Sequence, residues 1–401
     1  MGNGWILAAI FLYAAPPSDA ARTVRFATFN ASLNRDHPGD LARDLATPGD
    51  VQAGHVAEII QRIRPDVLLI NEFDHDPDGR SAMLFQDNYL SKGRNGAEPI
   101  SYPYRFTAGV NTGVASGVDL DGDGVAEARV GSRGYGNDAL GFGLFPGQYG
   151  MVIYSKYPID AASAVQFREV LWKDMPGALL PTKADGSPWY SAEALARLRL
   201  SSKSHWDVPI RIGARTVHVL ASHPTPPSFD GPEDRNGRRN HDEIRLWADF
   251  ISGGEKARYL GPAAAKPPES FVIMGDLNAD PTDGGSVPGA IGQLLDHPRV
   301  HSAFVPTSPG GAEAARLQGG VNAAQRGDPA QDTADFDDRS VGNLRADYVL
   351  PSADLRPVGG GIFWPVAADP LARLVQMTPA VASSDHRLVY LDLAIEGVEP
   401  K

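Results

Sequence analysis

The chain contains no cysteine among its 401 residues. Disulfide bonds, thiol nucleophiles and thiolate metal sites are therefore all excluded. A bound metal ion would need carboxylate, amide or imidazole ligands, which favours hard cations such as Mg²⁺, Mn²⁺ or Ca²⁺. The absence of cysteine fits an exported bacterial protein without requiring one.

The sequence also lacks an apolar run long enough to span a membrane, because the run at residues 5–15 is too short. The tripeptide Ser-Asp-Ala at 18–20 follows it, a pattern typical of a signal-peptide cleavage site. The first four residues carry no Lys or Arg, which weakens this interpretation, and a buried strand or helix is the alternative. We expect a signal peptide at residues 1–20 and a mature, periplasmic or secreted chain at 21–401.

Positive charge is scarce, since 37 basic residues face 49 acidic ones and the net charge is -12. Proteins that coat nucleic acid present a basic face to the phosphates, so general nucleic-acid binding is disfavoured. A local basic patch or an acidic, cation-binding cleft is compatible with this composition. Neither internal repeats nor a linker divides the chain, which predicts a single large domain.

Several short apolar runs typical of buried strands end in polar residues. The most informative is Phe271–Met274, which leads into Gly-Asp-Leu-Asn at 275–278. Asp276 and Asn278 would project the same way from extended backbone. There, Asp can deprotonate water or hold a cation, and Asn can orient the group on which Asp acts. Taken alone, a polar turn at a strand end explains these residues equally well.

Other predicted strands also end in polar residues. One ends at Asn30 and another at Glu72. Residues 205–222 are predicted to form a hairpin whose second strand ends just before His223. An amphipathic helix before Pro65 separates the first two strands, and this strand–helix–strand order predicts a layered α/β domain. Further strands are expected at 151–155, 344–351 and 387–393, and a helix at 244–251.

A cluster of cationic residues precedes the helix predicted at 244–251. It contains Arg235, Arg238 and Arg239 beside Asn240. Such a cluster is either the solvated start of a helix or a phosphate-binding group, and we favour the second interpretation slightly.

Asp119, Asp121 and Asp123 match the start of a calcium-binding loop. The acidic residue usual at the twelfth position is replaced by Val130, although Glu127 at the ninth could substitute. A calcium loop and an acidic surface loop are equally good interpretations. The glycine- and aromatic-rich stretch at 141–150 either rims a pocket or packs as an irregular loop, and 310–339 is expected to be a long surface loop.

The polar strand ends together resemble the endonuclease/exonuclease/phosphatase superfamily. The matching stretches are Phe-Asn at 29–30, Asn-Glu at 71–72, Ser-His-Pro at 222–224, Gly-Asp-Leu-Asn at 275–278, Asp-Tyr-Val at 347–349 and Ser-Asp-His at 384–386. The resemblance covers about 23–393. It implies a deoxyribonuclease I-like α/β fold, a four-layer α/β/β/α sandwich in which two mixed β-sheets pack face to face between helices.

The resemblance also implies a metal-dependent phosphoesterase that uses Mg²⁺ or Mn²⁺. It makes Glu72 the main metal ligand, with Asn30 and Asp385 nearby. Ca²⁺ remains open as a further ion because of the acidic loop.

By the same resemblance, Asp276 and Asn278 position or deprotonate the attacking water. His386, oriented by Asp347, contacts the scissile phosphate, and His223 is a second imidazole there. We expect an exported hydrolase of small or lipid-derived phosphoesters, mono- or diesters. The alternatives are an extracellular endonuclease, with nucleic acid as substrate, and a non-catalytic, calcium-stabilised binding protein.

Overall fold

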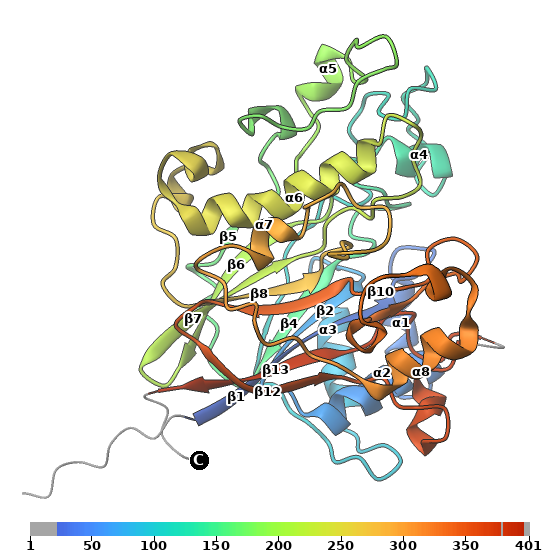
Figure 1. Cartoon of the computed structure of the whole chain (residues 1–401), viewed down its shortest axis with the longest axis vertical. Coiled ribbons are helices and arrows are strands. Elements are labelled where there is room, and N and C mark those ends of the chain that lie inside the picture. Colours follow the sequence, from blue (N-terminus) through green and yellow to red (C-terminus); the bar gives the residue numbers. More distant parts are fainter. Residues whose placement is uncertain (1–21, 378–379, 397–401) are drawn as a thin grey trace, which may run out of the picture.

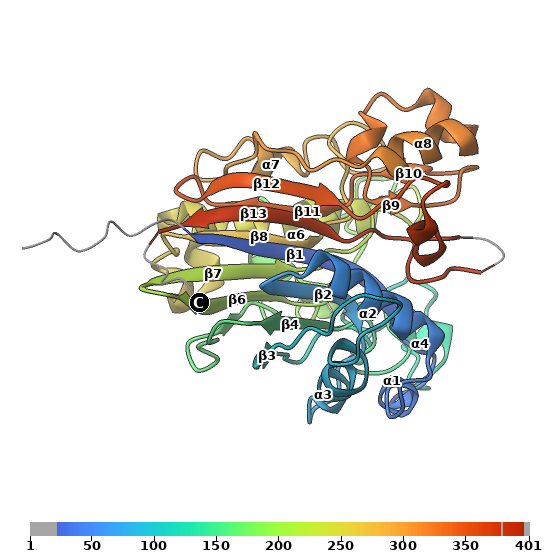
Figure 2. The same ribbon diagram turned by 90° about the horizontal axis from the view of Figure 1, so that it is seen from below.

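A computed structural model describes residues 22–377 and 380–396. The predicted signal peptide lies outside these residues. Two mixed β-sheets pack face to face, and helices cover their outer faces, so the predicted four-layer sandwich is confirmed (Figures 1 and 2). In the described part of the chain, no helix is long and apolar enough to cross a membrane.

The first sheet has the strand order β12-β13-β1-β2-β4-β3. Its strands, in that order, are Arg356–Ile362, Val389–Ile395, Arg22–Leu33, Val67–Phe73, Met151–Ser155 and Tyr104–Phe106. Strands β1 and β2 are parallel and are connected through α2 (Val51–Ile63), which ends before Pro65 as predicted. Helices α1 (Asp40–Asp44) and α3 (Arg80–Phe85), followed by a π-helical turn η1 (Gln86–Leu90), cover the same face as α2 (Figure 2).

The second sheet has the order β11-β8-β7-β6-β5. Its strands are Asp347–Pro351, Phe271–Asp276, Arg215–Ser222, His205–Ile212 and Val165–Gln166. The predicted hairpin is confirmed as β6 and β7. Strands β7 and β8 are parallel and are connected through α6 (Arg235–Ser252), which covers the outer face of this sheet (Figure 1).

The alternation of side chains along β8 shows how the layers are held together. Val272 and Met274 belong to the core that both sheets share, whereas Phe271 and Ile273 belong to a second core with Trp247 of α6. Full burial of one such side chain contributes about 1.5–3 kcal/mol. A run that is apolar at every position therefore predicts a strand buried on both faces.

Two sequence predictions are wrong in their boundaries. Helix α6 begins at Arg235, so the cationic cluster lies within its first turns and does not precede it. Residues 310–339 are not one loop, because they include most of α8 (Pro309–Gln318) and two 3₁₀ turns. Ser308 caps α8 by accepting a hydrogen bond from the Gly311 N–H, and Pro309 occupies its first turn. The helix was not predicted from the sequence because Gly310 and Gly311 lie in that turn.

The remaining elements are short. The structure gives two paired strands, β9 (Ala334–Asp335) and β10 (Asn343–Leu344). The helices are α4 (Arg133–Asn137), α5 (Ala192–Leu195) and α7 (Gly292–Leu295), and the 3₁₀ turns are η2 (Trp172–Asp174), η3 (Gly254–Leu260), η4 (Pro262–Ala264), η5 (Gly320–Ala324), η6 (Pro329–Gln331) and η7 (Pro370–Leu374).

Candidate active site

Strand directions bring the predicted residues to one end of the sandwich. Asn30 and Glu72 lie toward the ends of the parallel strands β1 and β2, and His386 precedes β13, which runs antiparallel to β1. In the second sheet, Asp276 ends β8 and pairs directly with Asp347, which begins the antiparallel strand β11. Residues far apart in sequence therefore meet at the same edge.

Asp276 is the centre of this group and is almost fully buried. Its Oδ2 accepts a hydrogen bond from Asn30 Nδ2 at 3.0 Å and lies 3.3 Å from His223 Nε2 and 3.7 Å from His386 Nε2. Its Oδ1 accepts a hydrogen bond from the Asn278 backbone N–H at 2.9 Å. Burial alone would raise the pKa of Asp276, but the two imidazoles outweigh it and hold that pKa below its usual range.

His386 bridges two carboxylates. Its Nδ1 lies 2.8 Å from Asp347 Oδ2, which also accepts a hydrogen bond from the Thr333 hydroxyl at 2.8 Å. Burial disfavours the charged ring, but Asp347 and Asp276 outweigh it and hold the pKa of His386 well above its usual value. Burial also raises the pKa of Asp347 to about 6. At neutral pH the pair is therefore a carboxylate and an imidazolium, with the shared proton on His386.

His223 contacts the same carboxylate oxygen but has the opposite charge preference. Burial lowers its pKa, and the nearby Lys203 ammonium lowers it further. Its Nδ1 is buried and has no hydrogen-bond partner in the described part of the chain. One imidazole at Asp276 is thus charged while the other is neutral.

Glu72 and Asp385 line a cavity of about 590 Å³ above this group. The Glu72 carboxylate makes no hydrogen bond or ion pair with any residue that the structure describes, whereas Asp385 Oδ1 lies 3.3 Å from the Ser32 hydroxyl. Carboxylates on a cavity wall, one of them without a hydrogen bond or ion pair to the described residues, fit a hard divalent cation. Asn30 is buried and donates its amide to Asp276, which places it behind the cavity.

A second set of groups has metal-ligand spacing, since one ligand atom each from Asp276, Asp347 and His386 lies within 4.8 Å of the others. The His386 ring lies between both carboxylates of this set, with Nδ1 2.8 Å from Asp347 and Nε2 3.7 Å from Asp276. Glu72 and Asp385, which line the cavity, are the other carboxylates that could hold a cation.

Strained backbone is concentrated around this cavity. Non-glycine residues with positive φ that line it are Ser32, Glu72, Tyr149, Phe229 and Asn278. Each such conformation costs about 1–3 kcal/mol, and such strain tends to gather at active sites and ligand clamps. The surrounding structure therefore holds these residues in backbone conformations that they would not adopt on their own.

The cationic cluster of α6 is divided by the fold. Arg235 and Arg239 line the cavity. Arg238 is half-buried, donates to the Glu233 carbonyl and does not line the cavity, and Asn240 is fully buried. The Asn240 amide donates to the carbonyls of Thr225 and Leu277, so its donor is engaged by backbone and not by the cavity.

Arg239 is also mainly structural. Its guanidinium donates hydrogen bonds to the carbonyls of Leu140, Arg199 and Leu200. Arg239 therefore connects α6 to the segments that contain Leu140 and residues 199–200. A role of Arg239 in binding phosphate would not explain these contacts.

Lys203, which the sequence patterns did not reveal, is buried and lines the cavity. Its Nζ donates to the Pro224 carbonyl at 3.3 Å. Burial lowers its pKa, while the carboxylates of Glu243, Glu72 and Asp276 oppose that shift. A lone lysine among serines forms no recognisable motif, so only the fold identifies it.

The acidic loop forms part of the cavity wall, because Asp121 lines it. One carboxylate oxygen each from Asp119, Asp121 and Asp123 lies within 4.8 Å of the others. The Asp119 carboxylate accepts the backbone N–H groups of Gly122 and Gly124, so the loop already satisfies it. Both interpretations of the loop therefore stay open.

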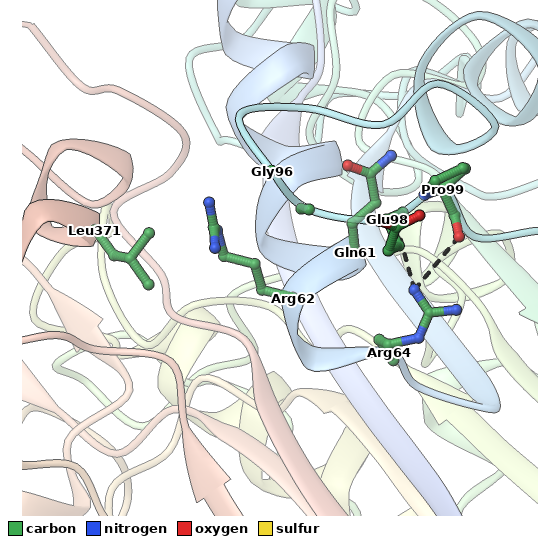
Figure 3. A pocket seen from close by; sticks show the side chains of 8 residues that line it. Gln61, Arg62, Arg64, Gly96, Glu98, Pro99 and Leu371 are labelled. Atoms are coloured by element: carbon green, nitrogen blue, oxygen red, sulfur yellow. Dashed lines mark hydrogen bonds between the residues drawn. The ribbon is translucent and has the colours of Figure 1, made fainter.

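A separate hollow of about 600 Å³ lies at the far end of β2, beside the end of α2 (Figure 3). Arg64 donates there to the carbonyls of Glu98 and Pro99, each at 3.3 Å. Arg62 is paired with Glu58. This hollow contains none of the predicted site residues.

A two-sheet sandwich with carboxylates, amides and imidazoles gathered at one edge defines the class of deoxyribonuclease I-like hydrolases. The sequence model of the Endonuclease/Exonuclease/phosphatase family matches residues 27–386, and the chain belongs to this family. No curated protein matches the sequence.

Solved structures resemble the chain at low identity. An endonuclease/exonuclease/phosphatase from Beutenbergia cavernae is 18% identical with a TM-score of 0.49, covering 94% of this chain and 72% of that one. Sphingomyelinase C from Streptomyces griseocarneus is 17% identical with a TM-score of 0.44, covering 92% and 99%. Truncated TDP2 from Caenorhabditis elegans is 14% identical with a TM-score of 0.42, covering 93% and 97%.

Proposed function

We propose that this family member is an exported, divalent-metal-dependent hydrolase of small or lipid-derived phosphoesters. The observation that carries the proposal is the buried Asp276 carboxylate with two imidazoles at one of its oxygens, in the same cavity as the Glu72 carboxylate. Phosphoryl transfer requires charge neutralisation and a positioned nucleophile, and this arrangement supplies groups for both.

The residues divide these tasks. Mg²⁺ or Mn²⁺ held by Glu72 and Asp385 would act as a Lewis acid on a phosphoryl oxygen. Asp276 and Asn278 orient the attacking water, and the depressed pKa of Asp276 favours positioning over proton abstraction. Charged His386, held by Asp347, donates a hydrogen bond to the phosphate.

Two further groups support the charged phosphate. Lys203 offers a second cation from the cavity wall, and neutral His223 holds Asp276 without adding positive charge. Arg235 contributes a third cation at the rim, where it is also paired with Glu233.

An extracellular endonuclease is the second candidate. The observation in its favour is the group of cations around the cavity, Lys203, Arg235 and the exposed Arg133, which offers local phosphate contacts despite the negative net charge. A non-catalytic calcium-stabilised protein would not need the charged and neutral imidazoles on one carboxylate.

A panel of phosphoesters tests these functions. A phosphodiester, a phosphomonoester and plasmid DNA are assayed with Mg²⁺, Mn²⁺ and Ca²⁺ and with a chelator, at physiological salt. The highest kcat/KM on a small ester supports our proposal, the highest on DNA supports the nuclease, and no turnover supports the binding protein. N-terminal sequencing from the native host tests export, with Ala21 as the expected first residue.

A further inference from the structure

Two phenylalanine side chains stand exposed at the rim of the active-site cavity. Phe142 is 47% exposed and Phe229 is 83% exposed, and both line the cavity. The other phenylalanines in the described part of the chain are buried or half-buried. Single exposed apolar residues are common on protein surfaces, so exposure alone does not indicate a function for these two. Their position at the cavity and their backbone conformation are more informative.

Phe229 has a strained backbone, with φ of 65° in the left-handed region that favours glycine. Its ring packs against little of the protein, so the folded state gains almost nothing from having a phenylalanine there. A ring that does not stabilise the fold, on backbone that a glycine would relax, indicates a use outside folding.

Phe142 lies between two glycines that are packed against neighbouring backbone. A Cβ at Gly141 would lie 1.8 Å from the Ser202 carbonyl oxygen, and a Cβ at Gly143 would lie 2.7 Å from the Gly113 nitrogen. The backbone here runs so close to its neighbours that neither glycine position tolerates a side chain. Within residues 141–143, Phe142 is therefore the one side chain that lines the cavity.

The surroundings of these rings suit a small planar group. Further rings on the cavity wall come from Tyr149, Tyr190 and Phe336. The volume of about 590 Å³ falls within the range of about 300–1,000 Å³ that small-molecule sites occupy. Two exposed polar residues of α4, Arg133 and Asn137, line the same cavity, which does not suit insertion into a bilayer.

We propose that the substrate is a phosphoester carrying a planar aromatic group, a nucleobase or an aryl ring, that packs against Phe142 and Phe229 while its phosphate lies at Asp276. This proposal rests on the proposed phosphoesterase function. Aromatic rings attract one another in offset or edge-to-face geometry beyond simple burial of apolar area. A planar group should therefore be preferred over a saturated group of similar size.

The test compares diesters that differ only in planarity. Benzyl methyl phosphate and cyclohexylmethyl methyl phosphate have similar size and similar leaving alcohols. We expect kcat/KM to be about tenfold higher for the benzyl ester, the effect of one stacking contact. Thymidine 5′-methyl phosphate serves as the nucleobase arm, and phosphatidylcholine vesicles serve as the lipid arm.

Variants locate the contact. Phe142→Ala and Phe229→Gly should each lower kcat/KM for the benzyl ester about tenfold and lower it less for the cyclohexylmethyl ester. Tyr104→Ala is the matched control, because Tyr104 is 39% exposed and lies outside the cavity. Phe229→Gly should not lower Tm, since glycine adopts the left-handed backbone without strain.

Each outcome decides something. Equal kcat/KM for the two esters in the parent, or a higher value on vesicles, would overturn the aromatic specificity while the phosphoesterase function stands. Hydrolysis of none of these substrates with either metal would overturn the proposed function and this specificity together.

Discussion

Asp276 contacts two imidazoles through one oxygen, and the environment gives these rings different charges. His386 gains a second carboxylate from Asp347, which raises its pKa, whereas burial and then the Lys203 ammonium lower the pKa of His223. A pair of titratable groups whose pKa values are pushed apart marks the acid and base assignments in many active sites. The identity of these residues followed from the sequence, but their charges depend on burial and neighbours.

Asp347→Asn should shift the pH dependence of activity. The Asp347 carboxylate stabilises the imidazolium, so its loss lowers the pKa of His386 and deprotonates the ring at lower pH. We expect the alkaline limb of the kcat/KM profile to move down by about 1–3 pH units. An unchanged alkaline limb in a folded variant would show that His386 does not act in its charged form.

The same pair links stability to pH. The folded-state pKa of His386 lies above its unfolded value of about 6.5. Its stabilising contribution is therefore complete below that pH and is lost as the pH rises through the folded-state pKa. Asp347→Asn should weaken this loss between neutral and alkaline pH.

Lys203→Met should lower kcat/KM about hundredfold, because it removes a cation from the phosphate site. Inhibition by inorganic phosphate should weaken in parallel, while Tm should not fall, since burial of a lysine is costly and methionine has similar length. An unaltered phosphate inhibition constant would assign Lys203 to structure alone. Lysine in this setting has no sequence signature, which is why fold information was needed to find it.

The strands β2, β7, β8 and β11 could be predicted because each contains a run of apolar residues, and β1 because its residues alternate between polar and apolar. The polar ends of these strands identified the site edge. The short helices were harder. Helix α8 contains Gly310 and Gly311 in its first turn, residues that usually argue against a helix, and its cap at Ser308 is a weaker signal. The extent of α6 was missed because its first turns are polar.

The cationic cluster of α6 gives a matched pair of variants. Arg239→Ala removes hydrogen bonds to three carbonyls, two of them buried, and should lower the free energy of unfolding by about 3 kcal/mol. Arg238→Ala, on the same helix but outside the cavity, should change it by less than about 0.5 kcal/mol. Denaturant unfolding measures both, and equal effects would contradict the structural role of Arg239.

The acidic loop at 119–124 can be tested by mass action. A calcium ion bound only to the folded chain raises Tm as its concentration rises. If the loop binds calcium, Asp121→Asn should lower Tm only when calcium is present. Equal Tm of the parent with and without calcium would identify an acidic surface loop.

Across the whole molecule, the sandwich brings the ends of two sheets to one edge, and long segments between the strands build the cavity above it. The fold and the family followed from strand-end motifs, because those motifs lie on regular elements. The cavity wall followed only in part. The stretch at 141–150 was one candidate for a pocket rim, and Phe142 and Tyr149 of that stretch line the cavity. Phe229 and Arg133 were not anticipated, because they come from an irregular segment and from the short helix α4, whose positions depend on tertiary contacts. The negative net charge is spread over the chain and does not prevent cations from gathering at the cavity.

The most direct test of the proposed function is Mn²⁺ binding and phosphodiester hydrolysis by the parent and Glu72→Gln. Glu72 has no partner within the described protein, so the variant should keep its Tm. Titration should show much weaker Mn²⁺ binding, and hydrolysis with Mg²⁺ or Mn²⁺ should fall more than about hundredfold. The parent should lose activity with a chelator. Undiminished hydrolysis by the chelated parent, or equal Mn²⁺ affinity in the variant, would contradict a metal-dependent phosphoesterase centred on Glu72.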